Sequence, residues 1–282
     1  MSRRAARSSG FSLIEVIVVI AVISILASMA VPYAVQVIDQ SRTEATRKEI
    51  EAIHKAIVGD PALGTAGYVG DMGRLPQAPA YLGQLNTQVP GQPNRSTGSL
   101  GVKMGWWGPY INTGFDANAY RRDEWGTDYA YNPGTGEIRS AGPDRNLNTA
   151  DDIFSPPPPS TVVIAGKLLV NLYVWDSATG GYVPNPRPGA AYPNMSASVQ
   201  FYYSNNGVQA NPPATASTPT YVPPFRFGFG AGEVSCGGRA CTSGLHAVSA
   251  AVSLQPPTTM TGQAVVFVPG NNQQAKLDLY LR

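Results

Sequence analysis

The chain has 282 residues, and its 20 basic and 18 acidic side chains leave a formal net charge of +2 at pH 7. Only 13% of the residues are charged and no basic block is longer than a few residues, so the electrostatic footprint of a nucleic-acid-binding protein is missing. With 30 glycines and 25 prolines, the composition favours a turn-rich, β-rich protein outside the cytoplasm over a helical cytosolic enzyme.

The amino-terminal segment combines early arginines with a long apolar stretch. Within residues 11–31 every residue except Glu15 is apolar or small, and a helix of this length spans roughly 30 Å, one hydrocarbon core. Arg3, Arg4 and Arg7 precede it, as expected on the cytoplasmic side of a membrane. The stretch is too long for the apolar region of a cleaved signal peptide, and no A-x-A-like site follows it. We therefore expect a membrane span that is retained.

The helical pattern continues beyond the apolar stretch. Further apolar residues recur at helical spacing with charges between them, namely Val37, Ile38, Ala45, Ile50, Ile53 and Ile57. Pro32 should kink the helix without ending it, whereas Gly59 and Pro61 are stop signals. We predict one transmembrane and stalk helix over residues 11–59, with a second half that is amphipathic and packs on a globular head.

Glu15 is the one charged residue in the apolar stretch. A carboxylate at membrane depth is costly, so an acid in this place needs an explanation. Two interpretations are open and compatible. Burial keeps the carboxyl protonated, or a partner of opposite charge neutralises it.

The run GFSLIE at residues 10–15 resembles the class III signal of type IV pilins and type II secretion pseudopilins. The resemblance implies that a prepilin peptidase removes the leader, residues 1–10, by cleaving between Gly10 and Phe11, and methylates the new amino terminus. It also implies that Glu15 pairs with the amine of a neighbouring subunit's first residue as subunits stack. The signal is specific because a basic leader, the GFSLIE run and a full-length apolar span occur together.

Residues 60–154 are rich in turn signals and form the predicted head. Four pieces resemble the major pseudopilin of type II secretion: GYVGDMGRLP (67–76), WGPYI (107–111), DEWGTDYAYNP (123–133) and GEIRSAGPDRNLNTADDI (136–153). With the amino terminus, the resemblance covers about residues 10–154 and implies a small antiparallel sheet packed on the helix. Aromatic residues of this part favour a core over a sugar-binding platform: Trp106, Trp107, Tyr110, Trp125, Tyr129 and Tyr131.

The end of the head is an acidic loop. Hard oxygen donors of the kind that Ca²⁺ prefers gather within a few residues: Asp144, Asn146, Asn148, Asp151 and Asp152. The pattern argues against an EF-hand, because Thr149 stands where that motif needs glycine and Ser155 where it needs glutamate.

The resemblance to the major pseudopilin implies a structural calcium ion in this loop. Its side-chain ligands would be Asp144, Asp151 and Asp152, and the carbonyls of Ala141 and Asn146 would contribute. The alternative interpretation is a solvated acidic turn without a metal.

The carboxyl-terminal segment differs in character from the head. SPPPPS at residues 155–160 predicts a stiff linker. Residues 161–282 then alternate strand-like stretches with turn clusters, and about seven short strands predict an antiparallel, all-β sandwich. The stretch has a weak resemblance to immunoglobulin-like and prealbumin-like bacterial surface modules. Residues 205–224 are predicted to be an exposed loop of this module.

Cys236 and Cys241 lie close together in CGGRAC, where the two glycines let a short loop close. In an oxidising compartment they predict a local disulfide. The rival interpretation is half of a zinc site, but the chain has no second cysteine pair and the nearest histidine is His246. No G-x-S-x-G or H-E-x-x-H motif occurs, so we expect that the protein is not an enzyme.

Together these patterns predict an α+β protein: a pilin-like helix, a head with a small antiparallel sheet and calcium loop, and a β-sandwich. The resemblance implies a subunit of a type II secretion pseudopilus, anchored in the bacterial inner membrane with its head in the periplasm. Its partners would be copies of itself, the prepilin peptidase, other pilins or pseudopilins and the inner-membrane assembly platform. The alternatives are a type IV pilin with an adhesive sandwich and a membrane-anchored binding protein that does not polymerise.

Overall fold

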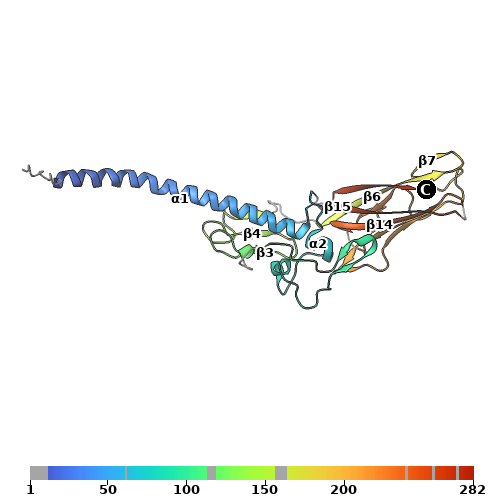
Figure 1. Ribbon diagram of the computed structural model, residues 1–282, viewed down its shortest axis with the longest axis horizontal. Helices are drawn as coiled ribbons and strands as arrows, with labels where there is room; N and C mark the ends of the chain where they lie inside the picture. Colours follow the sequence, from blue (N-terminus) through green and yellow to red (C-terminus); the bar gives the residue numbers. More distant parts are fainter. Residues whose placement is uncertain are drawn as a thin grey trace, which may run out of the picture.

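The fold is α+β and elongated, and it was analysed in a computed structural model that describes residues 12–60, 62–112, 119–155, 164–238, 241–255, 258–270 and 273–282. One long helix projects from one end, a small head lies beside its second half, and a β-rich domain occupies the other end (Figure 1). Strand β7 and the carboxyl terminus lie at the end opposite to the projecting helix.

Helix α1 runs from Leu13 to Val58 without interruption, including Pro32. Ser12 caps its first turn, and Gly59 ends it with a positive φ of 87° that favours glycine. The predicted single helix is therefore confirmed. Its first part is exposed, whereas the buried positions Ile50, Ile53 and Ile57 recur at helical spacing on the face that meets the head.

The head contains short helical turns and a small sheet. Its helical elements are α2 (Gly67–Met72), η1 (Tyr81–Leu85), η2 (Ser99–Gly101) and η3 (Ala119–Arg121). Its strands are β1 (Ser96–Thr97), β2 (Lys103–Met104), β3 (Ala130–Tyr131), β4 (Ile138–Ser140) and β5 (Ile153–Ser155). The antiparallel sheet β3-β4-β5 packs on α1 through Ile138 and Ile153, as predicted for a pilin-like head.

The carboxyl-terminal domain is built from eleven strands in the described residues. They are β6 (Ala165–Asp176), β7 (Gly181–Pro184), β8 (Ser196–Tyr202), β9 (Ser204–Asn205), β10 (Val208–Gln209), β11 (Ala214–Ser217), β12 (Phe225–Phe227), β13 (Cys241–Thr242), β14 (Gly244–Ser253), β15 (Met260–Val268) and β16 (Gln274–Leu281). One sheet has the order β11-β8-β14-β15, and the other is built on β6, which pairs with β7, β12, β13 and β16.

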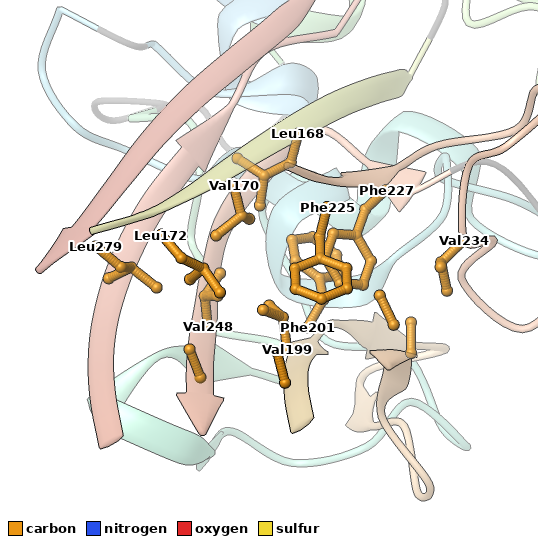
Figure 2. Close-up of a cluster of buried hydrophobic side chains, with 14 of the residues drawn as sticks. Leu168, Val170, Leu172, Val199, Phe201, Phe225, Phe227, Val234, Val248 and Leu279 are labelled. Atoms are coloured by element: carbon orange, nitrogen blue, oxygen red, sulfur yellow. The ribbon is translucent and has the colours of Figure 1, made fainter. Parts of the chain in front are cut away.

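The two sheets enclose one apolar core (Figure 2). Along strand β6 every second side chain is buried, namely Leu168, Val170, Leu172 and Val174. Asn171 breaks the alternation, because it is buried as well. Opposite them lie side chains of β8 and β14, including Phe201, whose ring stacks on Phe227 with centroids 5.3 Å apart. This facing arrangement confirms the predicted sandwich.

Two details differ from the sequence prediction. Strand β16 pairs with β6 in parallel, so the sandwich is not wholly antiparallel. The predicted exposed loop over residues 205–224 contains β11, which pairs with β8 and buries Ala214 and Ala216. Alanine is too small to mark a strand face by periodicity when prolines and threonines surround it, and that is why the pattern went unrecognised.

The head and the sandwich meet directly at α2. Gly70 of α2 lies against Gly244 at the start of β14, and a Cβ on Gly244 would stand 2.5 Å from the Gly70 Cα. Ser204 of β9 donates a hydrogen bond to the Asp71 carbonyl at 2.6 Å, and the Gly207 N–H donates to the Met72 carbonyl at 2.8 Å. The predicted linker lies mostly outside the described residues, but these contacts already join the two parts.

Candidate functional site

Glu15 lies in the first turn of α1. Its N–H donates to the side chain of Ser12 at 3.3 Å and to the Ser12 carbonyl at 3.1 Å, which fixes the start of the helix. An acid in this turn interacts favourably with the positive end of the helix dipole. Glu15 is also the only charged side chain between Ser12 and Asp39. Glu15, the assembly residue predicted from the sequence, therefore lies at the start of the exposed apolar half of α1.

The exposed half of α1 is apolar on all sides. An 18-residue window within the helix has a mean hydropathy of 2.8, and none of that window is buried inside the molecule. Its few polar groups are satisfied internally, because the hydroxyls of Ser24 and Ser28 donate to the carbonyls of Ile20 and Ile25. Among the described helices, α1 is long and apolar enough by composition to cross a membrane. Such a surface needs lipid or other apolar helices around it.

The second half of α1 is fixed to the head by polar as well as apolar contacts. The Tyr129 hydroxyl donates to the Glu49 carboxylate at 2.7 Å, and the Glu124 N–H donates to the Thr46 hydroxyl at 3.4 Å. Ile53, which is fully buried, packs in the core between these contacts. The second half of α1 is therefore joined to the head by a shared apolar core and by hydrogen bonds.

The predicted processing residues Gly10 and Phe11 lie outside the described residues, as does the leader, residues 1–10. The first described residue, Ser12, has extended backbone angles and precedes the helix as its amino-terminal cap. Processing at this position is therefore still a prediction from the sequence.

The acidic loop connects β4 to β5, and its carboxylates accept hydrogen bonds from the loop itself. Asp151 accepts from the Asp144 N–H at 3.0 Å and from the Thr149 hydroxyl at 2.7 Å. Asp152 accepts from the Asn148 N–H at 2.8 Å. These bonds hold the loop in a compact turn, and those at Thr149 and Asp144 hold the pKa of Asp151 below its usual value.

The oxygen atoms of this loop are of the kind that binds calcium, but in the described residues their arrangement does not form a calcium site. Asp144 accepts from the Asn146 N–H at 2.7 Å, and Asp152 lies 3.6 Å from the guanidinium of Arg139. Within the described residues, no three His, Cys, Asp or Glu side chains are gathered in a way that could hold a metal ion. Ala141, a predicted carbonyl ligand, is fully buried. The calcium site is still a prediction.

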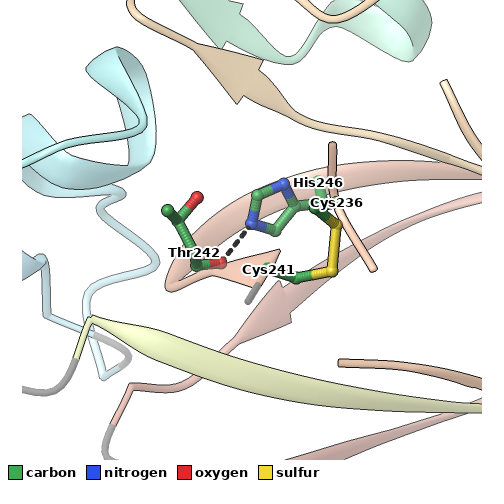
Figure 3. The surroundings of a disulfide bond; sticks show 4 residues. All are labelled: Cys236, Cys241, Thr242 and His246. Carbon is green, nitrogen blue, oxygen red and sulfur yellow. Dashed lines mark hydrogen bonds between the residues drawn. A yellow bond between two sulfur atoms is a disulfide. The ribbon is translucent and has the colours of Figure 1, made fainter. Parts of the chain in front are cut away.

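Cys236 and Cys241 form a disulfide in the sandwich (Figure 3). Both are buried in the apolar core, which is the environment of a structural bond and not of a zinc site. Nearby, His246 of β14 is 1% exposed, and its Nε2 hydrogen-bonds the Thr242 carbonyl at 2.7 Å. Burial lowers the pKa of His246 to about 4.

The aromatic residues of the head follow the predicted core role for the most part. Trp125 and Tyr129 are buried, and Trp106, Tyr110 and Tyr131 pack at the edge of the same core. Sequence reasoning missed Asp71, which is 4% exposed and accepts a hydrogen bond from Tyr110 at 2.9 Å. Its neighbours in GYVGDM gave no signal, because segments distant in the sequence bury it.

A comparison with known protein families gives a match at the amino terminus. Residues 5–31 match the family model described as the prokaryotic N-terminal methylation motif. The chain carries a type IV pilin-like prepilin signal. This signal implies processing by a prepilin peptidase and assembly with other pilins, and it points to a structural role in a pilus or secretion system. No curated protein and no solved structure matches the chain.

Proposed function

We propose that the protein is a structural subunit of a type II secretion pseudopilus. It is held in the inner membrane by α1 before assembly and polymerises into a filament that helps to drive protein export. The observation that carries this proposal is the exposed apolar half of α1, continuous with a half that is fixed to the head and preceded by the prepilin signal. A plain membrane anchor needs neither the signal nor Glu15.

Assembly follows from the chemistry of α1. When a subunit leaves the bilayer, its apolar half exchanges lipid for the equivalent helices of neighbouring subunits, and close helix packing stabilises the filament core. Glu15 then needs a partner of opposite charge, since a single buried carboxylate is strongly disfavoured. The new amino terminus of a neighbouring subunit, at Phe11 after cleavage, would supply it.

Two observations favour a secretion pseudopilus within this class. The order of short motifs over residues 10–154 resembles the major pseudopilin, and the three-stranded sheet packs on α1 with the acidic loop between β4 and β5. We propose that this loop holds a structural calcium ion through Asp144, Asp151 and Asp152 after its carboxylates turn inward, with carbonyls of Ala141 and Asn146 completing the shell.

A second candidate is a type IV pilin with an exposed sandwich. The position of the sandwich favours it, because this domain lies at the end of the molecule farthest from the projecting half of α1 (Figure 1). In a filament with α1 at its centre, the sandwich would face outward. Deleting the gene in its native host separates the candidates: loss of protein export supports the pseudopilus, and loss of surface filaments with intact export supports the pilin.

The assembly role of Glu15 is tested by Glu15→Ala beside Glu44→Ala, an exposed charge in the same helix. Both variants are produced in a bacterium with the assembly machinery, and sheared filaments are quantified against membrane-bound subunit. We expect Glu15→Ala to accumulate in the membrane and to lose filaments roughly tenfold or more, since a tenfold loss needs only about 1.4 kcal/mol and removing one partner of a buried ion pair costs roughly 3–5 kcal/mol. Glu44→Ala should assemble normally. Filaments of Glu15→Ala at the level of the unmodified protein would contradict the pairing role.

A further inference from the structure

A cavity of about 610 Å³ lies where the head, the end of α1 and the sandwich meet. Its wall is mostly apolar, with contributions from Ala56, Leu63, Val102, Trp107, Leu245 and Val265. The volume falls within the range that small-molecule sites occupy in proteins. The helix end, the turn after it, the 100–110 segment and strands β14 and β15 each supply part of the wall.

One charged side chain of this wall is buried and incompletely bonded. Asp71 is 4% exposed, and its Oδ2 accepts the Tyr110 hydroxyl at 2.9 Å. The Tyr110 hydroxyl has a single proton, which goes to Oδ2, and its oxygen accepts the Trp107 N–H at 2.9 Å, so the tyrosine has no donor left for the other carboxylate oxygen. The other oxygen, Asp71 Oδ1, is buried without a hydrogen-bond partner. A buried acceptor left in this state is costly unless something donates to it.

The cations near Asp71 are engaged elsewhere. Lys103 lies over the Trp107 ring, with its Nζ 4.9 Å from the ring centroid. Lys55 pairs with Glu51 at 3.2 Å and with Asp60 at 3.7 Å. Among the described residues, no basic side chain lies within 4.0 Å of the Asp71 carboxylate in an ion pair. Burial accordingly raises the pKa of Asp71 to about 7, with Tyr110 and Lys103 acting in the opposite direction.

We propose that this cavity binds a small primary amine carried on an apolar body. On binding, the side chain of Asp71, which lines the cavity, turns its buried Oδ1 toward the ammonium group and accepts a hydrogen bond from it. The apolar body fills the space between Trp107, Val102 and Leu245. An ammonium suits the site because it supplies both the missing donor and the missing opposite charge, and charge-assisted hydrogen bonds are the stronger kind. This ligand site goes beyond the filament function and does not depend on assembly.

The test uses the full chain in phosphatidylcholine nanodiscs, with empty nanodiscs as the blank, and titration calorimetry. Three probes share an indole body: tryptamine carries the ammonium, tryptophol carries a hydroxyl, and 3-ethylindole carries no added donor. We expect tryptamine to bind at one site and roughly tenfold or more tighter than 3-ethylindole, with tryptophol weaker than tryptamine. Equal affinities for the three probes, or no binding of tryptamine, would overturn the proposal.

Variants place the binding at this cavity. Asp71→Asn keeps the shape but removes the charge, and it should weaken tryptamine roughly tenfold to a hundredfold. Asp128→Asn is the matched control, since Asp128 is exposed in an ion pair with Arg122 and does not line the cavity. Unchanged tryptamine affinity in Asp71→Asn contradicts the assignment.

A further variant keeps the test decisive if Asp71→Asn does not fold. Ala52 is exposed on α1 and lines the cavity mouth, so Ala52→Trp fills space without disturbing the core. It should retain the melting temperature of the unmodified chain and lose tryptamine binding. Retained binding in Ala52→Trp would also overturn the proposal. Filament assembly is measured separately, so failure of this site leaves the filament proposal intact.

Discussion

At the scale of single residues, the polar side chains in apolar surroundings carry the most information. Glu15 could be recognised from the sequence, because it interrupts a run in which every neighbour is apolar. Asp71 could not, because α2, the loop at Tyr110 and strand β9 bury it only after they come together. The local sequence pattern indicates the helix or strand to which a residue belongs. It does not show whether segments distant in the sequence bury that residue.

His246 makes the stability of the sandwich depend on pH. Its folded pKa of about 4 lies below the ordinary value of 6.5, so the folded state binds fewer protons than the unfolded state between these values. The neutral ring therefore favours folding fully above about pH 6.5, and this contribution is lost as the pH falls towards 4. The shift corresponds to at most about 3 kcal/mol.

Replacing His246 with glutamine, which does not titrate, tests this dependence. We expect His246→Gln to be somewhat less stable than the unmodified chain at pH 7, and to lose less stability between pH 7 and pH 4.5. Denaturant unfolding of both proteins at the two pH values gives the comparison, and the other titrating groups, Asp71 among them, cancel in the difference. Parallel pH profiles for the two proteins would refute the account of His246.

At the scale of elements, a helix or strand could be predicted where its apolar residues recur at a clear helical or strand spacing. Helix α1 was clear because its apolar positions repeat at helical spacing up to Gly59, and β6 was clear because it is a long run of large apolar and aromatic side chains. Strand β11 was missed because its inward residues are alanines. The parallel pairing of β16 with β6 could not be predicted, because the side-chain pattern of a strand does not say which strand it pairs with or in which direction.

The acidic loop between β4 and β5 carries a prediction about calcium. Binding to the folded state alone would stabilise the protein by about 3 kcal/mol at a hundredfold excess over the Kd, or roughly 5–10 °C in Tm. We expect the full chain to melt higher in calcium than in chelator, and Asp144→Asn to lose most of this difference. Magnesium should substitute poorly, since it prefers a smaller octahedral shell. Identical melting curves with calcium and with chelator would show that the loop does not hold a structural calcium ion.

At the scale of the whole molecule, the contact between α2 of the head and strand β14 of the sandwich, here called the joint, holds the two parts together. The linker predicted at residues 155–160 lies mostly outside the described residues, and Gly70 and Gly244 bring the backbones of the head and the sandwich into direct contact. Only glycine permits this approach, and Gly244 also has a φ of 132°, where other residues are strained. The sequence contained both glycines, but nothing in it paired one with the other.

Gly244→Ala tests whether this joint couples the head to the sandwich. Its methyl group would press on the Gly70 Cα, so we expect a loss of roughly 1–3 kcal/mol of stability. If the joint couples the head to the sandwich, we expect the variant to unfold in two separate steps in scanning calorimetry where the unmodified chain unfolds in one. Gly181→Ala in β7 is the matched control, because nothing lies within 4 Å of a Cβ at that position. Equal stability of the two variants would show that the contact at α2 does not hold the parts together.

If the chain is a filament subunit, it is cleaved at its prepilin signal and keeps α1 for assembly. Mass spectrometry of the mature protein, isolated from membranes of cells that contain a prepilin peptidase, tests this most directly. We predict a chain that begins at N-methylated Phe11 and retains the whole of α1 and the domains beyond it. A chain that still begins at Met1, or one that has lost the apolar half of α1, would contradict the account.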